Sequence, residues 1–425
     1  MVQCINDLQC GIDLGNFGSL SILLYADDVV LLSQSDVGLQ NMLNTLWSWC
    51  NKWRLSVNDS KTKIVHFRPK RVKRSEKVFC LHEKLLETVE EYKYLGLYLQ
   101  EFLDYEFAAV KLANAGSRAL GTMRNKIYNV KDIQLRTFTK LFTTGITPIL
   151  DYCGSVWGFK NYKCIDDVQR KAVRYFLGLH KLCPIPAVDG EIGWISSSVR
   201  RIVQMVKLWN KLVVMDDDRL PKIVLLYNIS MMNEVDNWCS QISDIFNSIG
   251  LNIDLRSLSL VDTKFVYEKL VEKQVQVWEE QRSSKIKLRN YNLFKCDMTV
   301  EPYVRLSLKK HVRSQYAQFR TGILPLMIEI GRYYGTPLEE RFCPMCKKIN
   351  ENYIEDEFHL PCQCTFYNTE RDILYRNVSH SCTEFLNLDN FDKFLLLNMN
   401  FQMLTANFVH SAMKKRETYL YNTTL

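Results

Sequence analysis

A short segment near the amino terminus limits the fold of this chain more than any other part of it. Residues 20–33 read Leu-Ser-Ile-Leu-Leu-Tyr-Ala-Asp-Asp-Val-Val-Leu-Leu-Ser, so two apolar, β-favouring runs flank Asp27 and Asp28. This pattern predicts a strand, a tight turn and a returning strand. The fold must therefore present two adjacent carboxylates at a hairpin.

Two neighbouring carboxylates at such a place repel each other when both are ionised and partly buried. A divalent cation removes this repulsion, and a pair of Mg²⁺ ions is the usual device for nucleotidyl transfer. Mg²⁺ prefers oxygen ligands and keeps substrate phosphates in its shell. The alternative is an ordinary turn, because Asp is common in turns.

The segments after the hairpin predict an α+β unit over residues 1–100. Ser35 or Asp36 is suited to cap a helix. A short strand is expected at residues 64–67, and a second apolar segment at residues 92–99. The predicted helix carries apolar side chains at helical spacing: Leu39, Met42, Leu43, Leu46, Cys50 and Trp53.

From about residue 105 onward the apolar spacing becomes helical. Ile165, Val168, Ala172 and Phe176 repeat at intervals of three or four residues. No motif is evident in residues 216–310, which we expect to be helical packing material. The fold class expected for the whole chain is therefore α+β, with the strands near the amino terminus.

Four segments, in order, resemble reverse transcriptases of non-LTR (LINE-like) retrotransposons. Tyr25-Ala26-Asp27-Asp28 with the following Val-Val-Leu-Leu resembles their active-site hairpin. Residues 5–8 resemble the segment before it, residues 53–63 the next palm motif, and residues 92–96 the strand pair that grips the primer. Farther on, residues 148–158 resemble the helical region after the palm. The resemblance covers most of the chain, weakly over 216–310.

The resemblance implies a role for individual residues. Asp27 and Asp28 would hold catalytic Mg²⁺ in a two-metal site, and Lys61 would protonate the leaving pyrophosphate; a solvated lysine is the alternative for Lys61. RNA template, DNA primer or target, and deoxynucleoside triphosphates would be the partners. The residues implied in substrate binding are Tyr25, Ala26, Tyr94, Leu95 and Gly96.

One departure from the family pattern affects the expected activity. Reverse transcriptases take a third metal-binding Asp, and their fingers, from a region upstream of this hairpin, whereas 26 residues precede Asp27. A two-metal site lacking one carboxylate should lose most of its transition-state stabilisation. We therefore expect a carboxy-terminal portion of a reverse transcriptase that is inactive alone. The alternative is a retrotransposon-derived protein that binds nucleic acid without catalysis.

A second constellation lies near the carboxyl end. Cys343, Cys346, His359 and Cys364 follow C-x2-C…H-x4-C spacing, which suits four-coordinate, structural Zn²⁺. Cys362 is a rival for the last ligand, and buried reduced cysteines are the alternative to a metal site. Residues 355–359 and 364–367 resemble the cysteine/histidine motif of LINE-type polymerases, which implies Cys364 and a contact with nucleic acid.

The resemblance and the sequence pattern together predict five regions. They are a partial palm of a right-hand polymerase (1–100), a helical thumb-like region (101–215), a helical region of unknown role (216–310), a zinc-binding segment (311–378) and a helical tail (379–425).

The basic residues are concentrated in one place. The chain has a net charge of +8, and residues 61–77 contain eight Lys and Arg against one Glu. Such a run can bind phosphates without sequence preference, serve as a nuclear-import signal, or be a solvated loop. The candidate nucleic-acid contacts are Lys63, Arg68, Lys70, Arg71, Lys73 and Arg74.

No signal peptide and no apolar run long enough for a membrane span are visible in the sequence. We therefore expect an intracellular protein, nuclear or cytoplasmic, with no membrane partner. The oligomeric state is not evident from the sequence.

Overall fold

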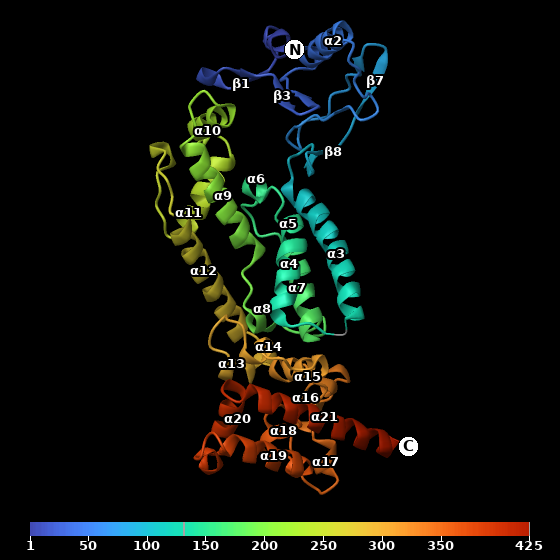
Figure 1. The fold of residues 1–425 in the computed structure, drawn as a ribbon, viewed down its shortest axis with the longest axis vertical. Helices are drawn as coiled ribbons and strands as arrows, with labels where there is room; N and C mark the ends of the chain where they lie inside the picture. The colour runs from blue at the N-terminus through green and yellow to red at the C-terminus, as the bar shows by residue number, and fades with distance from the viewer. Residues whose placement is uncertain (131, 425) are drawn as a thin grey trace. The chain divides into compact units, whose positions relative to one another are not determined.

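A computed structural model describes residues 1–130 and 132–424 of the chain. The labelled strands in Figure 1 all lie in the blue amino-terminal part, and the rest of the labelled chain is helical. Two compact units are built from discontinuous segments. Unit 1 comprises residues 1–114, 151–162 and 200–267, and unit 2 comprises residues 115–150, 163–199 and 268–425. The α+β fold class is confirmed, whereas the five-part sequential division stays a prediction.

Unit 1 contains all the named strands, arranged as small sheets rather than one continuous sheet. Each pairing is antiparallel except that of β5 with β7. The strands are β1 (Ile12–Asp13), β2 (Ser19–Leu20), β3 (Ile22–Tyr25), β4 (Asp28–Leu31), β5 (Lys63–Ile64), β6 (Phe79–Leu81), β7 (Lys84–Thr88), β8 (Glu91–Tyr94) and β9 (Leu97–Gln100).

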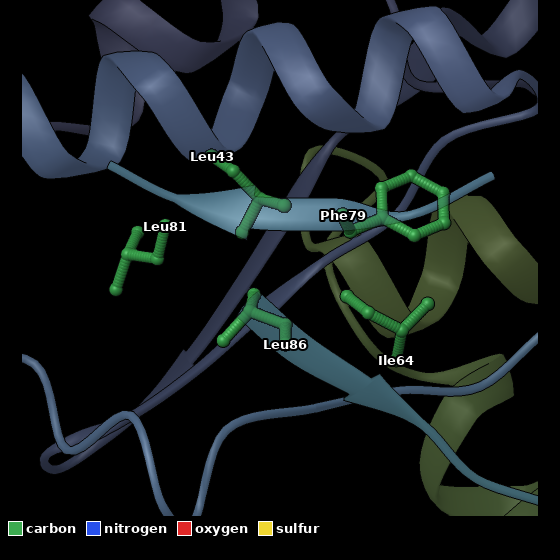
Figure 2. Packing of buried hydrophobic residues seen from close by; sticks show 5 residues of the cluster. All are labelled: Leu43, Ile64, Phe79, Leu81 and Leu86. Atoms are coloured by element: carbon green, nitrogen blue, oxygen red, sulfur yellow. The ribbon is translucent and has the colours of Figure 1, made fainter. Parts of the chain in front are cut away.

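Helix α2 (Asp36–Lys52) joins the β3–β4 hairpin to the other strands of unit 1. It begins after Ser35, whose hydroxyl accepts a hydrogen bond from the Gly38 amide, as a good N-cap does. Met42 packs with Ile22 of β3. One residue on, Leu43 belongs to a second core, shown in Figure 2, whose other members are Ile64, Phe79, Leu81 and Leu86. The base of the β3–β4 hairpin and the β5–β7–β6 sheet therefore both pack against the apolar face of α2.

The strands of this second core differ from the sequence-based expectation. The strand expected at residues 64–67 covers only Lys63–Ile64. Beyond it the Arg68 amide donates to the Glu101 carbonyl, so the chain leaves the sheet early. The β6–β7 hairpin was not predicted. Its turn is His82-Glu83, with His82 at φ 58°, and neither residue is a strong turn former.

The remaining elements of unit 1 are helical. Three helices contribute residues to both units: α3 (Tyr105–Asn129), α9 (Ser197–Val213) and α12 (Thr263–Ser283). The others are α1 (Val2–Asn6), α6 (Gly154–Trp157), α10 (Leu220–Met231) and α11 (Trp238–Ser248), with 3₁₀ turns at Gly15–Phe17 and Leu255–Ser257.

Unit 2 is helical throughout its named elements. Its α-helices are α4 (Leu135–Gly145), α5 (Thr147–Leu150), α7 (Lys163–Leu177), α8 (Ile185–Ile192), α13 (Tyr291–Phe294), α14 (Pro302–Arg305), α15 (Lys310–Arg320), α16 (Met327–Tyr333), α17 (Pro344–Lys347), α18 (His359–Cys362), α19 (Asn368–Ser379), α20 (Asn390–Met399) and α21 (Gln402–Thr424). Short 3₁₀ turns lie at Ile286–Leu288, Leu338–Glu340, Thr365–Tyr367 and Phe385–Asn387.

A buried charge network lies in the core of unit 2. Arg320 of α15 is 2% exposed and pairs with Glu191 of α8 and with Glu301. Glu301 also accepts from the Lys295 ammonium at 2.5 Å. Buried charges persist only when they are paired and hydrogen-bonded, so this network ties α8, α14 and α15 together. Among the helices described here, none is long and apolar enough to cross a membrane.

Candidate functional site

The two acidic residues stand at the turn of the β3–β4 hairpin. Tyr25 pairs with Asp28, so the loop consists of Ala26 and Asp27 alone. Ala26 has φ 52°, in the left-handed region that a two-residue hairpin loop demands and that alanine rarely adopts. A non-glycine residue held there indicates local strain of the kind found at functional sites.

The tip of this hairpin is open to solvent. Asp27 and Asp28 are exposed, as are the neighbouring Leu24, Tyr25 and Val29, with exposed fractions of 48%, 64% and 38% for these three. Adjacent exposed carboxylates supply the hard oxygen ligands that Mg²⁺ prefers, and the open face leaves room for phosphates and water. The donor set therefore fits a divalent cation.

A second strained hairpin, β8–β9, carries the residues implied in primer support. Tyr94 pairs with Leu97, so Leu95 and Gly96 form its two-residue loop, with φ values of 45° and 91°. Desolvation and the charge of Asp28 raise the pKa of Tyr94. Asp28 therefore lies within electrostatic range of Tyr94 on the second hairpin.

Tyr152 also belongs to this site, although it was interpreted from the sequence as part of a helical core region. Its hydroxyl donates to the Leu95 carbonyl at 2.5 Å. The residue lies 57 positions from Leu95. Its only signal in the sequence was its place in the segment 148–158 that resembles the family.

Lys61 lies beside the second hairpin. It is exposed, and its backbone carbonyl accepts a hydrogen bond from the Tyr92 hydroxyl at 3.3 Å. The position is compatible with either a catalytic or a solvated lysine.

The basic stretch divides into paired and solvated cations. Arg68 and Arg74 both contact the carboxylate of Glu101, at 3.0 and 2.6 Å, and Glu101 is 4% exposed. Lys63 pairs with Glu87 at 2.8 Å. Three of the candidate nucleic-acid contacts therefore also form ion pairs within unit 1.

The other three candidates, Lys70, Arg71 and Lys73, are exposed. The Lys70 ammonium lies 5.9 Å from the centre of the Phe102 ring, at the outer range of a cation–π contact. These three side chains are the part of the stretch most available to phosphates.

The four predicted zinc ligands gather in unit 2. The ligand atoms of Cys343, Cys346, His359 and Cys364 lie within 4.8 Å of one another, and all four residues are buried. The Sγ atoms of Cys343 and Cys364 are 3.9 Å apart, and those of Cys346 and Cys364 are 3.6 Å apart. Zinc–sulfur bonds of about 2.3 Å give a tetrahedral edge of about 3.8 Å. The spacing therefore fits tetrahedral zinc.

Local structure explains how these side chains converge. The Cys343 amide donates to the Tyr353 carbonyl at 2.7 Å, which closes a turn around the first cysteine pair. Asp356 accepts from the His359 amide at 2.8 Å and so fixes the start of α18. The His359 Nε2 atom lies 3.4 Å from the Cys346 sulfur.

The environment distinguishes Cys364 from its rival. Cys362 lies outside the cluster, and burial raises its pKa to about 12. Within the cluster, hydrogen bonds from Cys364 and His359 lower the pKa of Cys343 to about 4, whereas the pKa of Cys364 itself is raised, chiefly by its hydrogen bond to Cys343. The cluster therefore favours one thiolate, at Cys343, and it is the position of the sulfur atoms that separates Cys364 from Cys362.

Comparisons with known proteins agree with the hairpin geometry. Residues 1–99 match the family described as reverse transcriptase (RNA-dependent DNA polymerase). The chain is 28% identical over 159 residues to the RNA-directed DNA polymerase from transposon BS of Drosophila melanogaster. It is 26% identical over 147 residues to the RNA-directed DNA polymerase from mobile element jockey of Drosophila funebris.

These alignments cover 35% and 33% of this chain but only 18% and 16% of the two polymerases. A transposon-derived protein of Caenorhabditis elegans is 26% identical over 147 residues, which is 34% of this chain and 51% of that protein. Residues 1–99 are therefore a reverse transcriptase segment of the non-LTR, LINE-like retrotransposon type.

Proposed function

We propose that the chain contributes the catalytic and primer-supporting hairpins of an RNA-directed DNA polymerase. The observation that carries this proposal is the pair of exposed carboxylates, Asp27 and Asp28, on a strained turn beside the β8–β9 hairpin. RNA template, DNA primer or target, and deoxynucleoside triphosphates are its proposed partners.

Within that site, Asp27 and Asp28 bind Mg²⁺, which when bound activates the primer 3′-hydroxyl and stabilises charge at the transferred phosphate. Tyr25 and Ala26 line the site beside the incoming nucleotide. Lys61 donates a proton to the leaving pyrophosphate. Tyr94, Leu95 and Gly96 support the primer terminus.

Two further elements serve nucleic-acid binding in this proposal. Lys70, Arg71 and Lys73 contact phosphates, because they are exposed while their neighbours Arg68 and Arg74 hold Glu101. The Cys343–Cys364 cluster holds structural Zn²⁺, because its four ligands would close a tetrahedral site. The location proposed for this function is the nucleus or the cytoplasm.

The proposal is tested by metal binding, which does not depend on turnover. Mn²⁺ substitutes for Mg²⁺ at oxygen-ligand sites, and its free form has a sharp electron paramagnetic resonance signal. We expect the 425-residue chain with a primed RNA template to remove Mn²⁺ from solution. The double variant Asp27→Asn plus Asp28→Asn should bind it at least roughly tenfold more weakly, because both anionic ligands are lost.

A matched control is available in unit 2. Glu339 and Glu340 are also adjacent and exposed, so Glu339→Gln plus Glu340→Gln removes the same charge elsewhere. This control should leave Mn²⁺ binding unchanged. Template binding that persists without any dependence on Asp27 and Asp28 would favour the alternative function, a retrotransposon-derived nucleic-acid-binding protein without a catalytic metal.

A further inference from the structure

We propose that Tyr152 is a positioning residue that holds the tip of the β8–β9 hairpin against the primer 3′ end. This inference rests on the proposed polymerase function and deepens it. Tyr152 lies in residues 151–162, far along the chain from the palm strands but within unit 1.

The hairpin tip needs such support because of its backbone. Both loop residues have positive φ, which Gly96 tolerates at no steric cost. Leu95, at φ 45°, is a bulky residue in a region that L-residues other than Asn and Asp seldom adopt. Strain of this kind persists only where surrounding groups over-determine the conformation.

Tyr152 supplies two such restraints. Its hydroxyl donates to the Leu95 carbonyl at 2.5 Å, and its ring lies against Gly96. A Cβ atom added at Gly96 would come within 3.0 Å of the ring and of the hydroxyl oxygen. The tyrosine therefore fixes the carbonyl of one loop residue and excludes a side chain from the other.

A relay of hydrogen bonds fixes the tyrosine in turn. The Trp157 indole donates to the Tyr152 carbonyl at 2.8 Å, and the Tyr162 hydroxyl donates to the Trp157 carbonyl at 2.9 Å. Trp157 is fully buried and Tyr162 is 1% exposed. The hairpin tip is thus connected to a rigid core through Tyr152.

Ion pairs anchor the adjacent residue. Asp151 is 5% exposed and contacts Arg200 at 2.8 Å and Arg201 at 3.5 Å. The Arg201 guanidinium also lies over the rings of Trp157 and Tyr162, 5.1 and 5.3 Å from their centres. Because these contacts hold the backbone next to Tyr152 in place, the Tyr152 side chain can fix the position of the β8–β9 tip.

Tyr152 also lies near the catalytic hairpin. Cys153, desolvation and Tyr25 together raise the pKa of Tyr152. The ring is nevertheless 41% exposed, so filling the core does not account for its placement. Tyr152 thus contacts the primer-supporting tip directly and lies within electrostatic range of Tyr25 on the hairpin that carries Asp27 and Asp28.

The test uses the full chain with a recessed primer on an RNA template and Fe²⁺ in place of Mg²⁺. With added hydrogen peroxide and ascorbate, Fe²⁺ at Asp27 and Asp28 is oxidised as it reduces peroxide to hydroxide and hydroxyl radical, and ascorbate regenerates Fe²⁺. The radicals cleave nucleic acid nearby, so the cleavage pattern reports where the primer end lies. Tyr152→Phe keeps the ring and removes the hydrogen bond. We expect cleavage at the primer end to fall by roughly 2- to 12-fold relative to total binding, the range for one hydrogen bond.

Tyr175→Phe is the matched control, because the Tyr175 hydroxyl also donates to a backbone carbonyl, that of Arg124, at 3.3 Å. It should leave the pattern unchanged. Amide hydrogen exchange without nucleic acid provides a second readout: Tyr152→Phe should speed exchange at Gly96 and Leu97 while β6 and β7 keep wild-type rates.

The outcomes separate the two proposals. If the unaltered chain gives no cleavage at the primer end, the proposed function fails. If it cleaves there and Tyr152→Phe cleaves equally well, with unchanged exchange at Gly96, Tyr152 is not a positioning residue and this inference fails alone. Loss of cleavage with an equal loss of total binding would also overturn it, because a positioning role predicts displaced primer ends rather than absent nucleic acid.

Discussion

Replacing one proposed zinc ligand, Cys346, with serine is expected to abolish stoichiometric zinc binding. The unaltered chain should retain one zinc ion after dialysis, because the sulfur spacings of 3.6 and 3.9 Å match a tetrahedral edge of about 3.8 Å. Little rearrangement is then needed to bind the ion. Cys346→Ser removes a cluster sulfur that lies 3.4 Å from the His359 nitrogen.

How far loss of zinc unfolds the Cys343–Cys364 segment depends on the other contacts that stabilise it. Structural zinc contributes roughly 10–16 kcal/mol to the folding of small zinc-finger peptides. Here part of the segment has other support, since Arg416 of α21 pairs with the fully buried Glu355 at 2.7 and 2.8 Å. Loss of zinc should therefore unfold residues 342–367 locally, while α15 and α21 stay folded.

Two measurements check this prediction. Metal analysis by mass spectrometry should give one zinc per unaltered chain and far less than one for Cys346→Ser. Competition with a chelating dye should show an affinity loss well beyond the roughly 10- to 100-fold cost of losing an outer-shell partner. Hydrogen exchange should locate the unfolding.

Cys362→Ser is the decisive control. Cys362 is buried two residues from Cys364 but lies outside the ligand cluster. The Cys362→Ser variant should keep its zinc. The reasoning is refuted if Cys362→Ser loses zinc and Cys364→Ser keeps it, or if the unaltered chain binds none.

Three other changes give distinct expectations. Leu43→Ala should destabilise unit 1 by about 2–5 kcal/mol in a denaturant titration, because Leu43 is 3% exposed within the apolar core of Figure 2. A change below 1 kcal/mol would contradict the packing. Replacing the exposed cations Lys70, Arg71 and Lys73 with glutamine should reduce the slope of log affinity against log salt for a nucleic-acid duplex by about 2 to 3. An unaltered slope would mean that these side chains do not contact phosphates. The packing of α15 on α21 should weaken as pH falls from 7.5 to 5.5. Desolvation, His311 and Lys414 lower the pKa of His410 below its ordinary 6.5, so protonation favours the unfolded form. His410→Gln should flatten this pH dependence in hydrogen exchange, and an equal slope in the variant would refute the prediction.

The local parts of the site were predictable from sequence because local chemistry determines them. Two β-favouring runs around Asp27 and Asp28 indicate a hairpin, and Gly96 marks the second tight turn. The spacing of cysteines and histidine limits the zinc ligands to two sets; the resemblance to the family favours Cys364 over Cys362, and the three-dimensional packing agrees.

Contacts between distant residues were not predictable in the same way. Arg68 and Arg74 share the carboxylate of Glu101, 33 and 27 residues away, so a stretch predicted to bind phosphates or to form a solvated loop is also partly structural. No periodicity links Tyr152 to Leu95. The His82-Glu83 turn lacks the residues that signal a hairpin, because its left-handed residue is a histidine.

The central claim is that Asp27 and Asp28 bind a divalent cation at the primer end. Iron-directed cleavage of a primed RNA template, with the unaltered chain and with Asp27→Asn plus Asp28→Asn, tests it most directly. We expect cleavage that is confined to a few nucleotides around the primer 3′ end and is lost in the double variant. Cleavage that is absent in the unaltered chain, or that persists equally in the variant, would contradict it.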